Sequence, residues 1–346
     1  MLSEKALDKK KVFVFFLLGL AVFFLYLYFF VDVNQMITIM KRADPVYLTT
    51  AFIAVNFSVF FFAYTWKILL EILSVRVSMS QSLLLVWVST FIDLLIPAEA
   101  LSGEVSRAYM LSKSSSANIG SIAASIVSHR ILTMTMTLGG LIAGSITFLI
   151  GHKVHIYIVE FVIAITILSV ISIGGLYILG IKESITKRVV NALFRVVDFV
   201  TRGRMDLDHY RKVAETSLKH FHEGFKTLTR SPQGLIRSIF ASFLAWLFDL
   251  VLILFVFIAI GFPTSFSIVL IVYSFIGALQ TMPVGLPGVI GIAEIAMTTL
   301  YALLGIPVTV AATATVLTRV VSFWYRLFVG YIAFQFSGIK YFTKKN

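Results

Sequence analysis

Long apolar stretches recur along this chain, and six of them are long enough to cross a bilayer as helices. A spanning helix needs about 20 mostly apolar residues, because the hydrocarbon core is about 30 Å thick. The six predicted spans cover residues 12–31, 45–70, 118–150, 156–179, 234–260 and 308–336. The hydropathy pattern therefore predicts an all-α polytopic membrane protein.

Two further apolar segments are interrupted by proline and glycine. They cover residues 82–111, broken near Pro97 and Gly103, and residues 266–304, broken over residues 283–291. The part of the first segment that precedes its proline would rise only about 22 Å as a helix, which is less than the thickness of the hydrocarbon core. We therefore predict two re-entrant helical hairpins in addition to the six spans.

Basic residues decide how the interrupted segments lie in the membrane. Lys and Arg gather near both termini and in the section between the fourth and fifth spans, residues 182–232. Short loops rich in Lys and Arg stay in the cytoplasm. With two hairpins, an N-terminus inside the cell puts all three basic regions inside, whereas a single crossing by the first segment would translocate residues 182–232. We expect a multi-pass protein of the cell membrane with both termini cytoplasmic.

This topology predicts two membrane halves of opposite orientation, residues 1–181 and residues 233–346. Each half contains a hairpin followed by a long helix with an Arg at membrane depth, which is the layout of an inverted-repeat transporter. A chance likeness is the alternative, because Pro and Gly are frequent in membrane helices. Between the halves, residues 182–232 carry apolar positions at helical spacing with basic flanks, which predicts amphipathic helices on the cytoplasmic leaflet.

Composition sets the solvent and the classes of partner. The 346 residues are 59% hydrophobic and 13% charged, with a formal net charge of +12. The mean hydropathy of +0.95 places the chain in a bilayer. The positive charge suits contact with anionic lipid, and no nucleic-acid-binding motif is present. Because the chain has no cysteine and its six histidines show no metal-ligand spacing, we expect neither a metal nor another cofactor.

Arginines at membrane depth are candidate ligands for an anionic headgroup. A charge at the bilayer centre costs about 3 kcal/mol on insertion scales, so such a side chain needs a partner or a function. Arg107, Arg130 and Arg319 occupy the first interrupted segment and the long helices that follow the two hairpins. A guanidinium can bind phosphate through two parallel hydrogen bonds and keeps its charge at neutral pH. We therefore predict that these three side chains bind a lipid headgroup.

Main-chain amides at the two breaks are predicted to assist the arginines. The candidates are Ser102, Gly103, Gly288 and Gly291. Amides that begin a half-helix carry partial positive charge, and glycine lets a phosphate approach the main chain.

Three carboxylates at membrane depth, Glu104, Asp249 and Glu294, have two interpretations. They are counter-ions or proton carriers that couple headgroup movement to protonation, or they are static ion pairs with neighbouring arginines. Arg326 follows Arg319 by seven residues, about two helical turns, on a similar face but nearer the cytoplasm. We expect the Arg326 side chain to extend to the headgroup region.

Three motifs together resemble a known family. Pro97 to Arg107 reads Pro-x-x-x-x-x-Gly-Glu-x-x-Arg, Pro283 to Glu294 reads Pro-x-Gly-x-Pro-Gly-x-x-Gly-x-x-Glu, and Arg319 is followed by Trp324 and Gly330. Over nearly its whole length the chain resembles the transmembrane domain of lysylphosphatidylglycerol synthases, a family also described as flippase-like.

The resemblance implies a role in moving a lipid. It also implies that Glu104, Arg107, Glu294 and Arg319 line the path of that lipid. The synthases carry in addition a soluble domain that transfers an amino acid from charged tRNA, and the longest polar section here, about 50 residues, is too short to form one. Lysyltransferase activity is therefore not expected.

The leading hypothesis is a non-enzymatic translocase with no catalytic residue. It would move an anionic phospholipid or a polyprenyl-phosphate-type, lipid-linked intermediate across the cytoplasmic membrane. The first alternative is an accessory subunit that partners a separate lipid-modifying or glycosylating enzyme. The lesser alternative is an intramembrane phospholipid transferase that uses His129 with Glu104.

Overall fold

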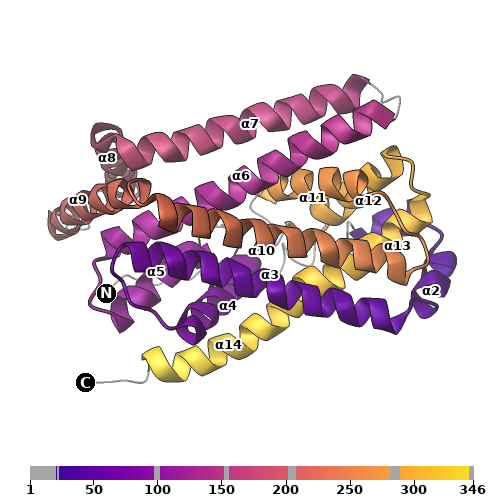
Figure 1. The fold of residues 1–346 in the computed structure, drawn as a ribbon, viewed down its shortest axis with the longest axis horizontal. Helices are drawn as coiled ribbons and strands as arrows, with labels where there is room; N and C mark the ends of the chain where they lie inside the picture. Colours follow the sequence, from indigo (N-terminus) through magenta and orange to yellow (C-terminus); the bar gives the residue numbers. More distant parts are fainter. Residues whose placement is uncertain are drawn as a thin grey trace.

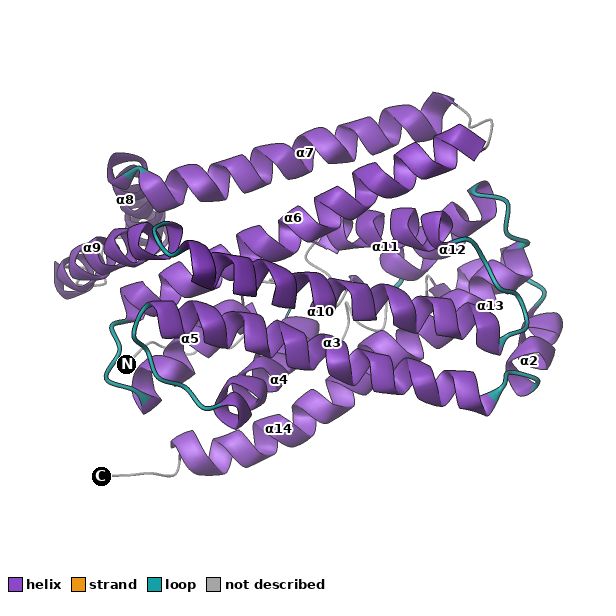
Figure 2. Ribbon diagram, viewed as in Figure 1, coloured by secondary structure: helices purple, strands orange, loops and turns teal. Residues whose placement is uncertain are grey.

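The computed structural model describes residue 21 and residues 23–96, 102–151, 156–201, 208–280 and 289–342. In this part of the chain the regular structure is helical throughout and contains no β-strand (Figure 2), which confirms the all-α prediction. A first helical segment covers Phe23–Phe30. It is followed by α2 (Val33–Lys41), α3 (Pro45–Ile72), α4 (Met79–Leu95), α5 (Ser102–Ser114), α6 (Ile119–Gly151), α7 (Ile156–Ile181), α8 (Glu183–Thr201), α9 (Asp208–Thr229), α10 (Pro232–Ala259), α11 (Phe266–Gln280), α12 (Ile292–Leu303), α13 (Val308–Arg319), the π-helix η2 (Val320–Trp324) and α14 (Tyr325–Phe342).

Five helices are long and apolar enough to cross a membrane, and they coincide with five of the six predicted spans. They are α3, α6, α7, α10 and the continuous rod formed by α13, η2 and α14. The remaining prediction, residues 12–31, falls partly outside the described residues. Its described end is helical over Phe23–Phe30 and meets α2 at an angle of 101°, so this bent pair forms a sixth candidate span.

Each interrupted segment consists of two short helices that contact one another. Helices α4 and α5 form the first pair, and α11 and α12 form the second. The longest of the four, α4, has 17 residues and a rise of about 25 Å, so none crosses a 30 Å core alone. The connecting residues 97–101 and 281–288 lie outside the described part of the chain. The re-entrant course of the hairpins and the inverted repeat therefore remain predictions.

The centre of the bundle is built on the pairing of α3 with α10, which run side by side through the molecule (Figure 1). Small side chains on the two helices, among them Ala51, Ala54 and Ala245, are buried, and small residues allow membrane helices to pack closely. The ring of Phe248 stacks on Phe57 and Phe61, with centroids 5.1 and 5.7 Å away. The result is a rigid pair of helices against which α4, α6 and α11 pack.

The section between the two membrane halves is helical, as predicted. Helices α8 and α9 lie at one end of the bundle, and α7 runs along its edge beside α6 (Figure 1). Phe221, Phe225 and Leu228 of α9 are buried against Leu69 and Ala124 of the bundle. The position of these helices on the cytoplasmic leaflet remains a prediction.

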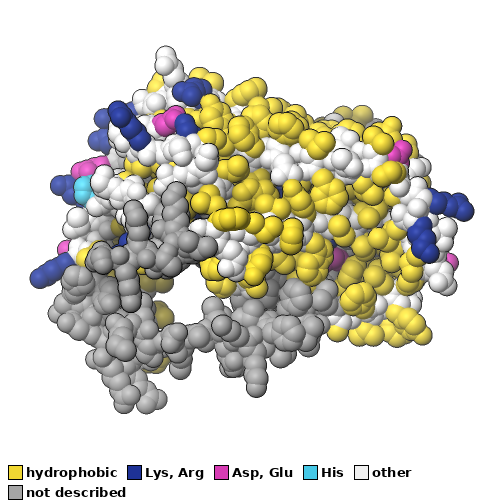
Figure 3. All heavy atoms as spheres, turned by 90° about the horizontal axis from the view of Figure 1, so that it is seen from below, with side chains coloured by type: hydrophobic (Ala, Val, Ile, Leu, Met, Phe, Trp, Pro, Cys, Tyr) yellow, Lys and Arg dark blue, Asp and Glu magenta, His cyan; other side chains and the backbone are white. Residues whose placement is uncertain are grey.

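The surface has the distribution of side chains that a bilayer requires. Figure 3 shows a broad hydrophobic band across the middle of one face, with Lys and Arg gathered toward its two ends. Such a band, flanked by charge at both membrane–water boundaries, matches a helical bundle that spans the hydrocarbon core.

Candidate functional site

A polar tract lies between the membrane helices at the centre of the bundle. It consists of two adjoining cavities of about 200 and 180 Å³. Both are lined by Thr90, Asp249, Tyr273 and Arg326, so these four residues stand where the cavities meet. We call the two cavities together the central tract. Since their lining comes from α3, α4, α6 and α10 to α14, the tract exists only once both halves of the chain have packed together.

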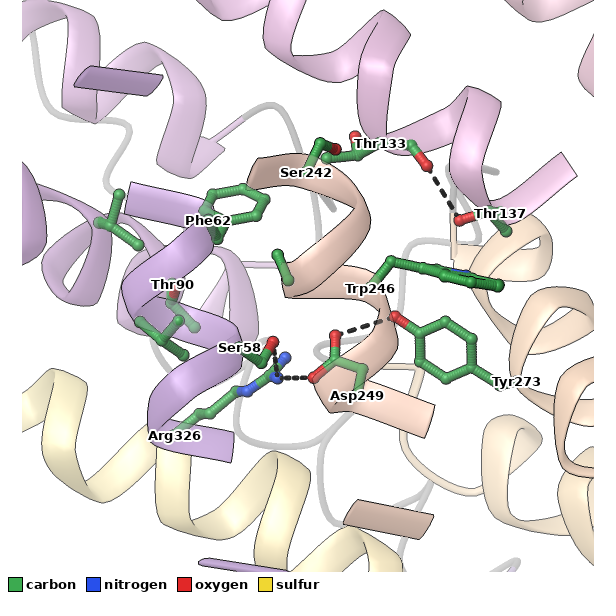
Figure 4. A pocket seen from close by; sticks show the side chains of 13 residues that line it. Ser58, Phe62, Thr90, Thr133, Thr137, Ser242, Trp246, Asp249, Tyr273 and Arg326 are labelled. Atoms are coloured by element: carbon green, nitrogen blue, oxygen red, sulfur yellow. Dashed lines mark hydrogen bonds and ion pairs between the residues drawn. The ribbon is translucent and has the colours of Figure 1, made fainter. Parts of the chain in front are cut away.

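An ion pair spans the junction of the two cavities. Nη2 of Arg326 donates to Oδ1 of Asp249 and lies 3.4 Å from the hydroxyl of Ser58, while the Tyr273 hydroxyl donates to Oδ2 of Asp249 at 2.9 Å. Figure 4 shows Arg326 and Asp249 pointing toward one another, with Tyr273 on the far side of the carboxylate. The expectation that Arg326 extends to the headgroup region is wrong, because its side chain turns into the bundle, where Asp249 compensates its charge.

Several polar atoms in the lining have no partner. Among the described residues, Ser242 Oγ, Trp246 Nε1, Thr318 Oγ1 and Arg326 Nε are buried and make no hydrogen bond. All four residues line the central tract. Buried polar groups are nearly always satisfied in native proteins, so a set of unsatisfied ones around a cavity indicates that water or a ligand completes them.

A second ion pair borders the second cavity. Arg319, which lines the second cavity, donates from Nε to Oε1 of Glu294 at 2.6 Å. Its guanidinium carbon lies 4.3 Å from the centre of the Phe323 ring, a cation–π contact. The other oxygen of Glu294 accepts from the main-chain N–H of Gly291 at 2.7 Å. Gly291 has φ of 87°, which favours glycine, so the predicted amide exists but is used by a carboxylate of the chain.

Three predicted residues of the first half, Glu104, Arg107 and Arg130, form a separate group with Asp93, which we call the α4–α6 cluster. Nη1 of Arg130 donates to Oε1 of Glu104 at 3.1 Å. Both arginines lie close enough to Asp93 and Glu104 to interact with them electrostatically. Arg107 and Arg130, both among the described residues, line neither cavity of the central tract. Of the three predicted arginines, the structure places Arg319 on the tract and Arg107 and Arg130 in a separate cluster, and their binding of a headgroup stays a prediction.

At the first break, the predicted donors Ser102 and Gly103 are already hydrogen-bonded to Asp93. Its Oδ1 accepts from the Gly103 N–H at 2.6 Å and from the Ser102 hydroxyl at 3.0 Å. A Cβ on Gly103 would overlap both the Asp93 carboxyl group and the carbonyl oxygen of Ser89. Glycine here permits contact between two helices, and a headgroup would have to displace Asp93 to reach these donors. The fourth predicted amide, Gly288, lies outside the described residues.

Arg107 is held by aromatic rings. Its guanidinium carbon lies 4.4 Å from the Trp66 ring centre and 5.8 Å from that of Phe62. The residue is 2% exposed, and its Nε and Nη1 have no hydrogen-bond partner among the described residues. His129 is equally buried and packs on Phe62 with a ring distance of 4.2 Å. Because His129 packs on a ring and Glu104 is paired with Arg130, the transferase hypothesis gains no support.

The three predicted carboxylates are all paired, as the ion-pair interpretation expects. Glu104 pairs with Arg130, Glu294 with Arg319 and Asp249 with Arg326. Asp249 differs from the other two because it lines both cavities. The described residues contain no group of three His, Cys, Asp or Glu side chains that could hold a metal ion.

Sequence reasoning missed the polar residues that surround Asp249. Ser58, Thr133, Thr137 and Ser242 line the first cavity together with Tyr273. Each is a small polar residue or tyrosine within a long apolar helix, and such residues are too common in membrane helices to be singled out. Only their convergence from α3, α6, α10 and α11 identifies them.

The helical architecture and the charged tract define a multi-pass membrane protein with a polar site enclosed by its spanning helices. The chain belongs to the family of the lysylphosphatidylglycerol synthase TM region, whose family model matches residues 16–330. The resemblance found in the motifs is thereby confirmed.

Curated relatives match along most of their length. The chain is 25% identical over 310 residues to a UPF0104 membrane protein of Pyrococcus horikoshii, covering 88% of this chain and 91% of that protein. It is 27% identical over 307 residues to a UPF0104 membrane protein of Methanothermobacter thermautotrophicus, covering 86% and 88%. A third UPF0104 membrane protein, from Methanocaldococcus jannaschii, is 25% identical over 312 residues, or 88% of each chain.

Proposed function

We propose that this protein moves the anionic headgroup of a lipid across the membrane through the central tract. The observation that carries this proposal is the position of Arg319 and Arg326 on cavities between spanning helices, beside buried polar atoms without partners. Charged and unsatisfied groups are costly inside a membrane, and a path for a polar substrate is their usual function. The family of the chain supports a lipid as the substrate.

The size of the tract suits part of a lipid. Cavities of about 200 and 180 Å³ are smaller than the roughly 300 to 1,000 Å³ of pockets that enclose drug-sized ligands. A phosphate with a small headgroup fits this space, and acyl chains do not. The chains would remain in the surrounding bilayer while the headgroup passes between the helices.

The substrate class follows from the arginines. A guanidinium fork recognises phosphate, so both phosphatidylglycerol derivatives and polyprenyl-phosphate carriers satisfy the site. Apolar chains suit the hydrophobic band on the surface, which faces the bilayer (Figure 3). Alternating exposure of the tract to the two sides would then carry the headgroup from one leaflet to the other.

The test is reconstitution into liposomes that contain fluorescent phosphatidylglycerol or an aminoacylated derivative. Leaflet exchange without chemical change supports translocation. A new lipid species on chromatography instead supports the transferase, and the absence of both effects favours the accessory subunit.

Paired variants assign the activity to the tract. Arg326→Gln should reduce leaflet exchange at least tenfold, a loss of about 1.4 kcal/mol, because the variant removes the phosphate-binding charge. The matched control is Arg237→Gln, since Arg237 lies at the start of α10, where its guanidinium is 3.5 Å from the Tyr64 hydroxyl, and it does not line either cavity. Equal exchange by both folded variants would remove Arg326 from the mechanism.

A further inference from the structure

The charges of the central tract cancel before any substrate binds. Arg326 is paired with Asp249, and Arg319 is paired with Glu294. Two arginines and two carboxylates sum to a formal charge of zero. Counting the described residues, an anionic headgroup that enters therefore adds one negative charge to a site whose arginines are already neutralised.

Of the described residues, Asp249 is the carboxylate placed to remove this excess negative charge. Asp249 lines both cavities, whereas Glu294 lines neither and is held by Arg319 and by the Gly291 amide. A phosphate that binds Arg326 must compete with Asp249 for the same guanidinium. If Asp249 stayed ionised after being displaced, it would face the phosphate across the cavity in a medium of low polarity.

We propose that Asp249 takes up one proton when an anionic headgroup binds at Arg326, so that headgroup and proton occupy the tract together. This inference rests on the proposed function and adds the identity of the coupled ion. Protonation leaves the tract neutral with its substrate bound, and the neutral acid can donate a hydrogen bond to a phosphate oxygen or to a neighbouring hydroxyl.

The surroundings of Asp249 single it out as the titrating group. Helices α3, α4 and α6 contribute serine and threonine to the lining of the tract, α11 contributes Tyr273, α14 contributes Arg326, and α13 contributes Arg319. Tyrosine and arginine ordinarily keep their protons between about pH 5 and 8. Among the described residues that line the tract, Asp249 is the carboxylate that a phosphate bound at Arg326 would displace, so it is the group to which the added negative charge drives a proton.

The expected pH dependence has a definite sign. A lower pH neutralises Asp249 and releases Arg326, so the headgroup binds more tightly and exchange becomes faster. By linkage, binding of the headgroup draws a proton from solution. With one proton taken up per headgroup bound, affinity falls by up to about tenfold for each unit of rising pH.

The experiment measures leaflet exchange of fluorescent phosphatidylglycerol by the full-length protein, with equal pH on both sides, between about pH 5 and 8. The probe is a phosphodiester, which keeps a single negative charge in this range, whereas a phosphate monoester titrates near pH 6. We expect faster exchange at acid pH by the native protein and a pH-independent rate in Asp249→Asn. The control Glu71→Gln alters an ion pair with Lys67 outside the tract and should keep the native profile.

Calorimetry of the native protein tests proton uptake even if the Asp249→Asn variant does not fold or does not catalyse lipid exchange. Binding of phosphatidylglycerol in two buffers of different ionisation enthalpy should reveal uptake of about one proton per lipid. Exchange or binding that is independent of pH, or an Asp249→Asn profile like that of the native protein, would overturn proton coupling and leave translocation standing. Absence of both binding and exchange at every pH would instead overturn the proposed function.

Discussion

Glu294 and Arg319 form an ion pair of 2.6 Å in which each side chain is only 7% exposed. The carboxylate lies in the first turn of α12, the second helix of the second interrupted segment, and the arginine lies 25 residues later on α13. Glu104 and Arg130 stand in the same relationship, 26 residues apart on α5 and α6. The two interrupted segments are thus each joined to the following helix by an ion pair between a carboxylate and an arginine, while the inverted repeat stays a prediction.

Removing one partner of the buried pair should destabilise the fold. We expect Glu294→Gln to lower the free energy of unfolding by about 3 to 5 kcal/mol, because the variant leaves the Arg319 charge without its carboxylate. Thermal unfolding in detergent measures the effect. The control is Glu71→Gln, whose partner Lys67 is at the surface and whose loss should cost about 1 kcal/mol or less. Equal losses in both variants would contradict the importance of burial.

The close contact at Gly103 should tolerate no side chain. We expect Gly103→Ala to reduce the yield of folded protein or its melting temperature, because the added methyl group overlaps the Asp93 carboxyl group and the Ser89 carbonyl. Gly174 provides the matched control, since a Cβ there meets nothing within 4 Å. Gly174→Ala should be neutral or slightly stabilising, because alanine favours a helix by about 1 kcal/mol over glycine. A melting temperature for Gly103→Ala equal to that of the native protein would refute the overlap.

The stacking of Arg107 on Trp66 should appear as a coupling energy. In a double-mutant cycle of Trp66→Leu and Arg107→Gln, we expect a coupling of about 1 to 2 kcal/mol, since the cation and the ring are both shielded from water. The cycle of Lys113 with Tyr109 is the control, because that cation lies 5.7 Å from its ring near the surface. Its coupling should not exceed about 1 kcal/mol. Indistinguishable couplings in the two cycles would argue against a special contribution from burial.

The re-entrant course of the first hairpin can be tested by labelling, because the chain has no cysteine of its own. Ser80 and Ser116 are exposed positions just inside the start of α4 and just after the end of α5. In whole cells and inverted vesicles, a membrane-impermeant maleimide should label Ser80→Cys and Ser116→Cys from the same, cytoplasmic side. Labelling from opposite sides would show that the segment crosses once.

Placement of the second hairpin calls for a parallel pair of sites. Ser265 is exposed and lies between the end of α10 and the start of α11. Thr229 is the last residue of α9 and lies just before the start of α10. Under the predicted topology, Ser265→Cys is labelled from outside the cell and Thr229→Cys from inside. Both variants labelled from inside would contradict a spanning α10.

Long-range packing explains why the spans were predictable and the site was only partly so. Hydropathy located α3, α6, α7 and α10 to within a few residues, because an apolar run of that length has no alternative environment to a bilayer. The pairing of Arg326 with Asp249 joins residues 77 positions apart and depends on how α14 crosses α10. A π-helix immediately before Tyr325 also alters the helical register there, and no local sequence pattern predicts this π-helix.

The sequence by itself determined the solvent, the helical class, the spans and the identities of the charged residues at membrane depth, since each follows from the cost of exposing polar groups to hydrocarbon. Tertiary structure alone decided which charges meet. It placed Arg107 and Arg130 in one cluster and Arg319 and Arg326 on one tract, because ion pairing inside a membrane depends on which helices pack together, and that is set by small residues and shape over the whole bundle.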